Sequence, residues 1–189
     1  MFGFYGKLPA HGDFIRFRAD AGFVLAWDGW LQQCFAASRE QLGAGWDEAY
    51  QNAPIWRFCF GAGLCGPDAI VGVMMPSQDR VGRMFPLTVF QKRGGTPDAA
   101  QLDAEPAMTQ VEDAMLHALT RQTDKSVLAD QLQAIDLPDA GGGAGGQSHW
   151  LSVFFGGEAR RDVFAFDGLP SPEAYCDLLR PANVESADV

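Results

Sequence analysis

The segment that most constrains the fold is residues 71–90, where two apolar runs flank a short charged loop. The first run, 69–75, is long enough for a strand buried on both faces, and it ends at Pro76, which has no backbone N–H for a ladder. The second run, 84–90, is rich in β-branched and aromatic residues, which favour strands. The sequence therefore predicts two core strands joined by a charged loop, an arrangement that holds polar side chains on a rigid scaffold.

That loop, residues 77–83, contains three charged side chains and one glycine, and two interpretations of it stay open. In the first, Asp79 pairs with Arg80 or Arg83 and the ion pair only stabilises the connection. In the second, Gly82 adopts a positive φ and turns backbone N–H groups to one side, and the two guanidinium groups help to bind a phosphate or a carboxylate. The spacing of the residues does not decide between them.

Size and charge narrow the class of protein. A chain of 189 residues with 47% hydrophobic residues is expected to form one domain that buries about 70% of the surface of the unfolded chain. The net charge of −10 opposes binding to nucleic acid or to an anionic membrane surface. The sequence contains no apolar run near the ~20 residues of a membrane span and does not begin with a secretory signal pattern. We therefore expect a cytoplasmic protein that does not insert into the membrane.

No pattern typical of a metal, cofactor or catalytic site is present in the sequence. The four cysteines contain no CxxC pair and are expected to be reduced, mostly buried thiols. The three histidines are not at metal-ligand spacing. His11 and Asp13 lie close together but have no serine or cysteine nucleophile beside them, so a hydrogen-bonded turn is the expected interpretation. The histidines and cysteines are His11, His117, His149, Cys34, Cys59, Cys65 and Cys176.

Periodicity along the chain predicts an α/β fold. Residues 55–60, 69–75 and 84–91 follow one another with short links, which indicates an antiparallel meander. Apolar residues at helical spacing predict helices between these strands and the others. A glycine-rich run at 141–146 lacks the ending of a phosphate-binding loop and is expected to be a flexible loop. The further strands are expected at 2–5, 150–155 and 163–166, and the helices from Asp20 to Gly43, briefly at 46–50, at 108–119 and 128–135, and from Pro172 onward with Ser171 as its N-cap.

We therefore predict a single layered domain over residues 1–180, with a mostly antiparallel sheet of about six strands and helices packed on both faces. Residues 181–189 are expected to be a frayed C-terminal tail.

Several blocks in the first 90 residues resemble one family. They are FYGKLP at 4–9, GDF at 12–14, APIWRF at 53–58 and MPSQDRVGRMFPLT at 75–88, in the order found in the TagF (ImpM) family of accessory proteins of the bacterial type VI secretion system. The second half of the chain carries no motif that is recognisable alone. We expect the chain to lack the phosphatase domain that is fused to some members, so the resemblance implies no phosphatase activity.

The resemblance implies a non-enzymatic regulator in the cytoplasm, recruited to the inner-membrane face of the secretion apparatus. It would be a post-translational negative regulator acting against the threonine-phosphorylation pathway that activates assembly, by binding the forkhead-associated (FHA) scaffold protein. The two polar loops within the matching blocks then become a candidate partner-binding surface. Its residues are Lys7, Asp13, Arg16, Asp79, Arg80 and Arg83.

Two alternatives come from other classes of protein. One is a hydrolase acting on a phosphorylated substrate, with His11 and Asp13 near the arginine pair. The other is a structural component of the secretion apparatus. The sequence leaves open which surface binds, whether the partner must be phosphorylated, and the oligomeric state.

Overall fold

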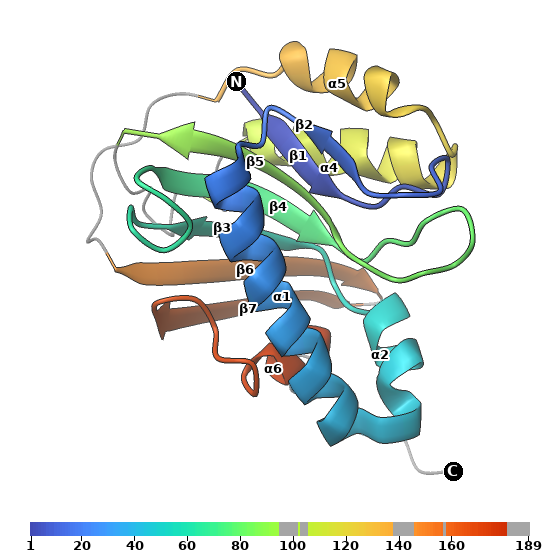
Figure 1. Cartoon of the computed structure of the whole chain (residues 1–189), viewed down its shortest axis with the longest axis vertical. Coiled ribbons are helices and arrows are strands. Elements are labelled where there is room, and N and C mark those ends of the chain that lie inside the picture. Colours follow the sequence, from blue (N-terminus) through green and yellow to red (C-terminus); the bar gives the residue numbers. More distant parts are fainter. Residues whose placement is uncertain (95–101, 103–105, 138–145, 157, 181–189) are drawn as a thin grey trace.

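The computed structural model describes residues 1–94, 102, 106–137, 146–156 and 158–180. They form an α/β fold in which helices flank an open sheet on both faces (Figure 1). The strands are β1 Gly3–Gly6, β2 Ile15–Phe17, β3 Trp56–Phe60, β4 Ala69–Met75, β5 Leu87–Arg93, β6 Gln147–Gly156 and β7 Glu158–Asp167. The helices are α1 Ala21–Leu42, the 3₁₀ turn η1 Gly43–Gly45, α2 Trp46–Gln51, α4 Pro106–Thr120, α5 Lys125–Gln133 and α6 Tyr175–Leu179.

The sheet has seven strands in the order β2-β1-β5-β4-β3-β6-β7, and every neighbouring pair is antiparallel. The predicted meander is confirmed, because β3 pairs with β4 and β4 with β5. The prediction of about six strands was close. The strand that it missed is β2, which has only three residues and is too short to show a period of two.

The first face of the sheet is covered by α1, with α2 and α6 beside it, over a core rich in aromatic side chains. α1 begins where it was predicted, because the carboxylate of Asp20 accepts a hydrogen bond from the Phe23 N–H at 2.9 Å. Trp27 of α1 stacks on Phe58 and on Trp150 of the sheet. The buried Nε1–H of Trp27 donates to Thr88 Oγ1 at 3.0 Å, so its polar atom has a partner. Trp27 and Trp30 of this helix are therefore part of the core.

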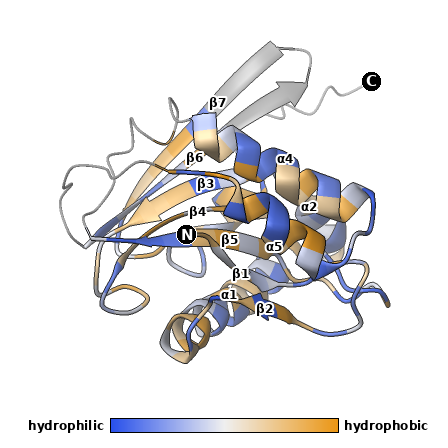
Figure 2. Ribbon diagram, turned by 90° about the horizontal axis from the view of Figure 1, so that it is seen from above, coloured by the Kyte–Doolittle hydropathy of each residue, from blue (hydrophilic) through white to orange (hydrophobic). Residues whose placement is uncertain are grey.

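The opposite face is covered by α4 and α5 over a mainly aliphatic core, and Figure 2 shows the two helical layers on opposite sides of the strands. Arg57 of β3 points to this side, as the alternation of side chains along a strand requires when Trp56 and Phe58 face the other side. Its guanidinium group pairs with the Glu112 carboxylate of α4 through two hydrogen bonds of 2.6 and 2.9 Å. This pair fastens α4 to the sheet.

Four elements have boundaries that differ clearly from the predictions. β5 begins at Leu87 rather than at residue 84, because residues 84 and 85 belong to the connection described below. β6 and β7 are both longer than expected. α6 begins at Tyr175, three residues after Pro172, although Ser171 Oγ still accepts a hydrogen bond from the Ala174 N–H at 3.2 Å.

Two predicted segments fall largely outside the described residues. They are the glycine-rich loop, of which only Gly146 is described, and the C-terminal tail at 181–189. No helix in the described ranges is long and apolar enough to cross a membrane.

Candidate functional site

The connection between β4 and β5 is itself a small hairpin, residues 77–85, here called the 77–85 hairpin. Gln78 and Met84 form an antiparallel bridge, and the Asp79 N–H donates to the Arg83 carbonyl at 3.1 Å. The Gly82 N–H donates to the Asp79 carbonyl at 3.0 Å, and Gly82 has φ 85°. A turn followed by a left-handed glycine is a common geometry for a three-residue hairpin loop, and it explains why glycine stands at this position.

The carboxylate of Asp79 lies at the centre of this hairpin and is almost completely buried, at 2% exposure. Its Oδ1 accepts the backbone N–H groups of Val81 and Arg83 at 3.0 and 2.9 Å. Its Oδ2 accepts Lys7 Nζ at 3.0 Å and Arg83 Nε at 2.7 Å. The concave set of N–H groups that the sequence offered to an external anion is thus occupied by the protein's own carboxylate.

These contacts set the ionisation of Asp79. Burial alone raises the pKa of this carboxyl group, but the hydrogen bonds from the Arg83 backbone, Lys7, the Arg83 side chain and the Val81 backbone outweigh it. The net effect holds the pKa of Asp79 well below its usual value of 3.8. Asp79 is therefore ionised at neutral pH and acts as the structural anchor of the hairpin.

The β1–β2 loop, residues 7–14, packs directly against the 77–85 hairpin. The Arg80 N–H donates to the His11 carbonyl at 2.8 Å, and Arg83 Nη2 donates to the Gly12 carbonyl at 2.6 Å. Ser77 Oγ donates to the Lys7 carbonyl at 2.7 Å. The two polar loops that lie about 70 residues apart in the sequence are therefore one continuous structure.

Of the six residues predicted for one surface, four are distributed over this structure in two layers. Lys7 and Asp79 are buried beneath the surface, so they support it and do not reach a partner themselves. Arg80 and Arg83 are exposed above them, with 61% of the Arg83 side chain accessible.

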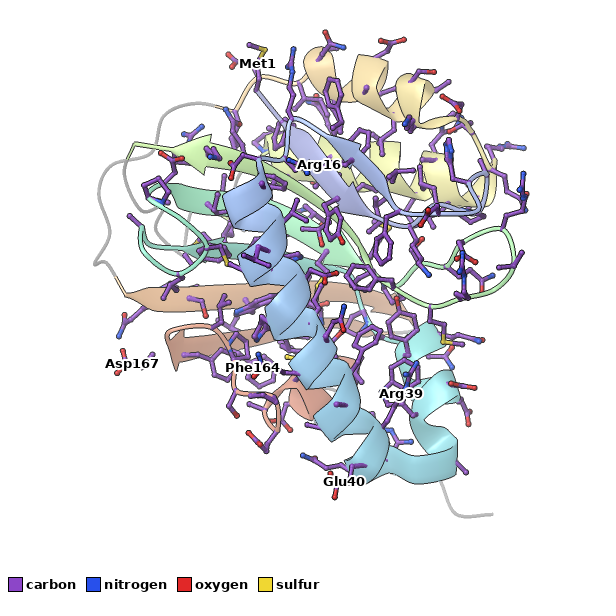
Figure 3. All side chains as sticks on the ribbon, viewed as in Figure 1. Met1, Arg16, Arg39, Glu40, Phe164 and Asp167 are labelled. Atoms are coloured by element: carbon purple, nitrogen blue, oxygen red, sulfur yellow. The ribbon has the colours of Figure 1, made fainter. Side chains whose placement is uncertain are left out.

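The other two predicted residues lie at the margin. Asp13 is exposed on the β1–β2 loop, where its Oδ1 accepts the Phe14 N–H at 2.8 Å. Arg16 on β2 turns away, because its Nε donates to the Ala19 carbonyl at 2.5 Å just before α1 (Figure 3). Arg16 thus belongs to the start of α1 and not to the 77–85 hairpin.

A third segment joins the two loops, and sequence reasoning missed it. The ring nitrogen Nε2 of His11 accepts the Lys125 N–H at 3.1 Å and lies 3.3 Å from Asp124 Oδ2 at the start of α5. The two partners are separated by more than 110 residues, and no local pattern signals the contact. His11 thus links the start of α5 to the β1–β2 loop, and its carbonyl also accepts the Arg80 N–H of the hairpin.

Burial raises the pKa of three cysteine thiols, those of Cys34, Cys65 and Cys176. All four are free thiols, and Cys34, Cys59 and Cys65 are buried as predicted. Burial raises the pKa of Cys65 to about 12, so this thiol is protonated at neutral pH. Among the residues that the structure describes, no three histidine, cysteine, aspartate or glutamate side chains are grouped so that they could hold a metal ion.

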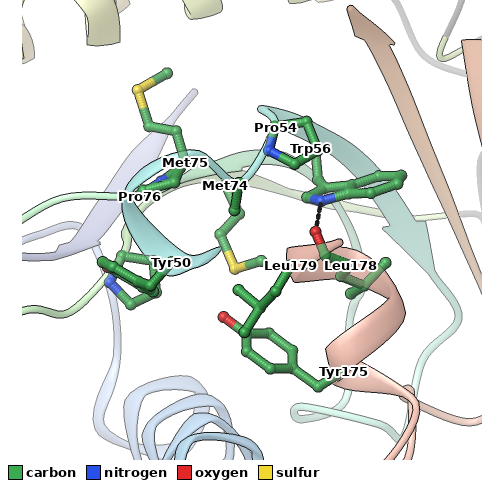
Figure 4. Close-up of a pocket in the computed structure, with 11 residues that line it drawn as sticks. Tyr50, Pro54, Trp56, Met74, Met75, Pro76, Tyr175, Leu178 and Leu179 are labelled. Carbon is green, nitrogen blue, oxygen red and sulfur yellow. Dashed lines mark hydrogen bonds between the residues drawn. The ribbon is translucent and has the colours of Figure 1, made fainter. Parts of the chain in front are cut away.

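Two hollows lie near the hairpin. An open pocket of about 270 Å³ lies beside the hairpin base, and its lining includes Pro9, Tyr50, Gln51, Gln78, Met84 and Leu119. The second, between α2, α6 and the ends of β3 and β4, holds only about 10 Å³ (Figure 4), which is room for at most one water molecule. There Trp56 Nε1 donates to the Leu178 carbonyl at 2.9 Å, so the smaller hollow is a packing gap.

Comparisons with known proteins identify a matching family and a solved structure with a similar fold. The family described as TagF N-terminal domain, type VI secretion system-associated, matches residues 3–135. The crystal structure of PA0076 from Pseudomonas aeruginosa PAO1 matches with a TM-score of 0.83 and 30% sequence identity, over 97% of this chain and 96% of that chain. No curated protein sequence matches. The matched family segment contains both polar loops and the start of α5.

Proposed function

We propose a regulatory function for this chain, which belongs to the TagF N-terminal domain family associated with type VI secretion. It is a non-enzymatic, post-translational negative regulator of type VI secretion. It acts against the threonine-phosphorylation pathway that activates assembly by binding the FHA-domain scaffold protein in the cytoplasm.

The observation that supports binding rather than catalysis is the 77–85 hairpin. Its backbone and its central carboxylate are held by hydrogen bonds within the molecule, while the side chains of Arg80 and Arg83 face solvent. A surface that is ordered before binding loses less conformational entropy when a partner binds. Arginine is also among the residues that contribute most to protein interfaces.

Calorimetric titration of the scaffold into this protein tests the proposal, with the scaffold in its phosphorylated and unphosphorylated forms. The informative variant is Arg80→Ala, because Arg83→Ala also removes hydrogen bonds to Asp79 and to Gly12. Arg18→Ala is the matched control, since Arg18 is an exposed arginine after β2, at the opposite end of this strand from the β1–β2 loop.

We expect micromolar or tighter binding by the wild type and by Arg18→Ala, and weaker binding by Arg80→Ala. Binding that is equal in all three proteins would retain the scaffold as partner and move the contact to another surface. If neither form of the scaffold binds the wild type, the proposed mechanism of repression is wrong.

A further inference from the structure

The tip of the 77–85 hairpin presents a cationic side chain, Arg80, next to an apolar one, Val81. The chain as a whole is negatively charged. The side chain of Arg80 is exposed and lies against Gly12, and it makes no hydrogen bond or ion pair with any other described residue. Val81 beside it is 69% exposed, although the backbone around it is firmly held. Gly82 borders open space, since a Cβ added there would meet no atom within 4 Å. An ordered tip with an exposed valine and an uncommitted guanidinium group is typical of a contact site for a partner.

The backbone at the tip has no donor left for a ligand. The four N–H groups from Arg80 to Arg83 all donate within the molecule, one to the His11 carbonyl and three to the carbonyl or carboxylate of Asp79. Phosphate sites in proteins commonly combine such N–H groups with a cation. Here only guanidinium groups remain available to an anion.

These guanidinium groups differ in what they can offer. Arg83 already uses Nε on Asp79 and Nη2 on the Gly12 carbonyl. Arg80 keeps its full planar set of donors, which matches the two oxygens of one carboxylate. The β1–β2 loop contains one acidic residue, Asp13, and its carboxylate accepts a hydrogen bond from the Phe14 N–H. A guanidinium group can pair with a phosphate as well, but the tip lacks the free backbone N–H groups that phosphate sites commonly add, and one carboxylate needs only one guanidinium group.

We propose that the tip of the 77–85 hairpin is the docking site for an acidic segment of the partner protein. Arg80 pairs with a carboxylate of that segment, and Val81 contacts an apolar side chain next to it. The buried Lys7–Asp79 pair is neutral as a unit, so Arg80 and Arg83 determine the charge that the tip presents. Because the chain as a whole carries a net charge of −10, its overall field disfavours an acidic segment, and the two arginines at the tip provide a local positive charge that attracts one.

A peptide titration tests the site without assuming the identity of the partner. The ¹⁵N-labelled full chain is titrated with the peptide Glu-Asp-Leu-Asp-Glu, with its amide counterpart Gln-Asn-Leu-Asn-Gln, and with a phosphothreonine peptide of equal length. We expect the acidic peptide to shift the backbone amide signals of residues 80–82, and the amide peptide to leave them unchanged. The shifts should disappear in Arg80→Ala and remain in Arg18→Ala.

Three results would overturn the inference. They are the absence of shifts at millimolar acidic peptide, shifts that persist in Arg80→Ala, and a phosphothreonine peptide that binds more than about tenfold tighter than the acidic one. Arg80→Lys provides a finer test, because it keeps the charge and removes the planar pair of donors. We expect it to bind the acidic peptide more weakly than the wild type and more tightly than Arg80→Ala.

The identification of the acidic segment with the FHA scaffold rests on the proposed function, and a second measurement separates the two ideas. Arg80→Glu and Val81→Ser should each weaken scaffold binding by about tenfold or more, with melting temperatures near that of the wild type. If the scaffold binds the wild type and both variants equally, the docking site is wrong while the proposed function stands. If the acidic peptide binds at the tip but the scaffold does not bind at all, the docking site stands and the proposed partner is wrong.

Discussion

At the scale of single residues, Asp79 organises the candidate surface without belonging to it. One carboxylate accepts two backbone N–H groups, Lys7 Nζ and Arg83 Nε. Removing one member of such a buried cluster leaves its charged partners and hydrogen-bond donors unpaired. The resulting loss of folding free energy is larger than the loss when the whole cluster is replaced by apolar residues. Substitutions at Asp79 are therefore expected to disturb the surface indirectly, by releasing the backbone of the hairpin.

The pH dependence of stability provides a test of this role. The pKa of Asp79 is lower in the folded protein than in the unfolded chain. The stability that Asp79 contributes is therefore fully present above the unfolded-state pKa and is lost progressively as the pH falls from there toward the folded-state pKa. We expect Asp79→Asn to be less stable than the wild type at pH 7, and the difference to shrink between about pH 5 and pH 3. Urea unfolding across this range measures it, with Asp113→Asn on the exposed side of α4 as control. A difference that is constant with pH would contradict the assignment.

Gly72 at the centre of β4 provides a second test at this scale. A Cβ on Gly72 would lie 2.4 Å from the Val89 carbonyl oxygen and 2.7 Å from Phe58 Cζ, so backbone or core must shift. We expect Gly72→Ala to lower the free energy of unfolding by about 3 kcal/mol or more. Gly29→Ala is the contrasting variant, because it lies within α1 with open space around it, and alanine there should stabilise the protein by about 1 kcal/mol. Chemical denaturation measures both variants. Equal changes in the free energy of unfolding would contradict the idea that the backbone of β5 and the ring of Phe58 leave no room for a Cβ at residue 72.

At the scale of elements, the two helical layers are attached to the sheet by different means. α1 is held by stacked aromatic rings, among them Trp27 on Phe58. α4 packs through aliphatic residues and is also joined to β3 by the Arg57–Glu112 pair. The guanidinium group of Arg57 further donates to Thr109 Oγ1 and to the Leu102 carbonyl. One side chain of β3 thus orients the whole start of the α4 segment.

Breaking that pair should loosen α4. We expect Arg57→Met to lower the free energy of unfolding by about 3 kcal/mol, because the carboxylate of Glu112 then has no cation beside it. The double variant Arg57→Met/Glu112→Leu should recover part of the loss, since it leaves no unpaired charge. Chemical denaturation of the two single variants, the double variant and the wild type measures the coupling. If the double variant loses the sum of the two single losses, the pair does not fasten α4 as described.

At the scale of the whole molecule, the candidate surface lies at one end of the strands, where β4 continues into the 77–85 hairpin and elements from both layers meet. The β1–β2 loop, the 77–85 hairpin and the start of α5 are joined there through His11 and Asp79. The pocket of about 270 Å³ beside the hairpin is lined by residues from α2 and α4 as well. A partner that docks at this end of the strands would therefore contact α2 of one helical layer and α4 of the other.

A binding repressor and a hydrolase differ in their dependence on dose. A protein that sequesters the scaffold acts in proportion to its amount, whereas a hydrolase would act at a small fraction of the scaffold concentration. We expect secretion to fall as the chain approaches equimolar amounts with the scaffold in cells, with no change in scaffold threonine phosphorylation in vitro. Release of phosphate from the phosphorylated scaffold above the buffer rate would contradict a non-enzymatic regulator.

The local elements of this protein followed from sequence alone. The span of β4 and the start of α1 at Asp20 were predicted, because strand length and helix capping depend on near neighbours. The grouping of the two polar loops into one surface was a hypothesis from the family motif blocks; the loops are in contact through the Arg80 N–H and the His11 carbonyl, and partner binding at them stays a prediction. The brief strand β2 and the late start of α6 were not predicted, because short elements depend on what they pack against.

What only the tertiary structure decided is the role of each side chain at the candidate site. The prediction from sequence grouped Lys7 and Asp79 with Arg80 and Arg83 on one surface. In the folded chain the first two are buried and the other two are exposed. It also brings His11 to the start of α5. These outcomes depend on contacts between residues about 70 to 115 positions apart. Burial and pairing at such separations are set by chain closure and packing, for which no local pattern exists.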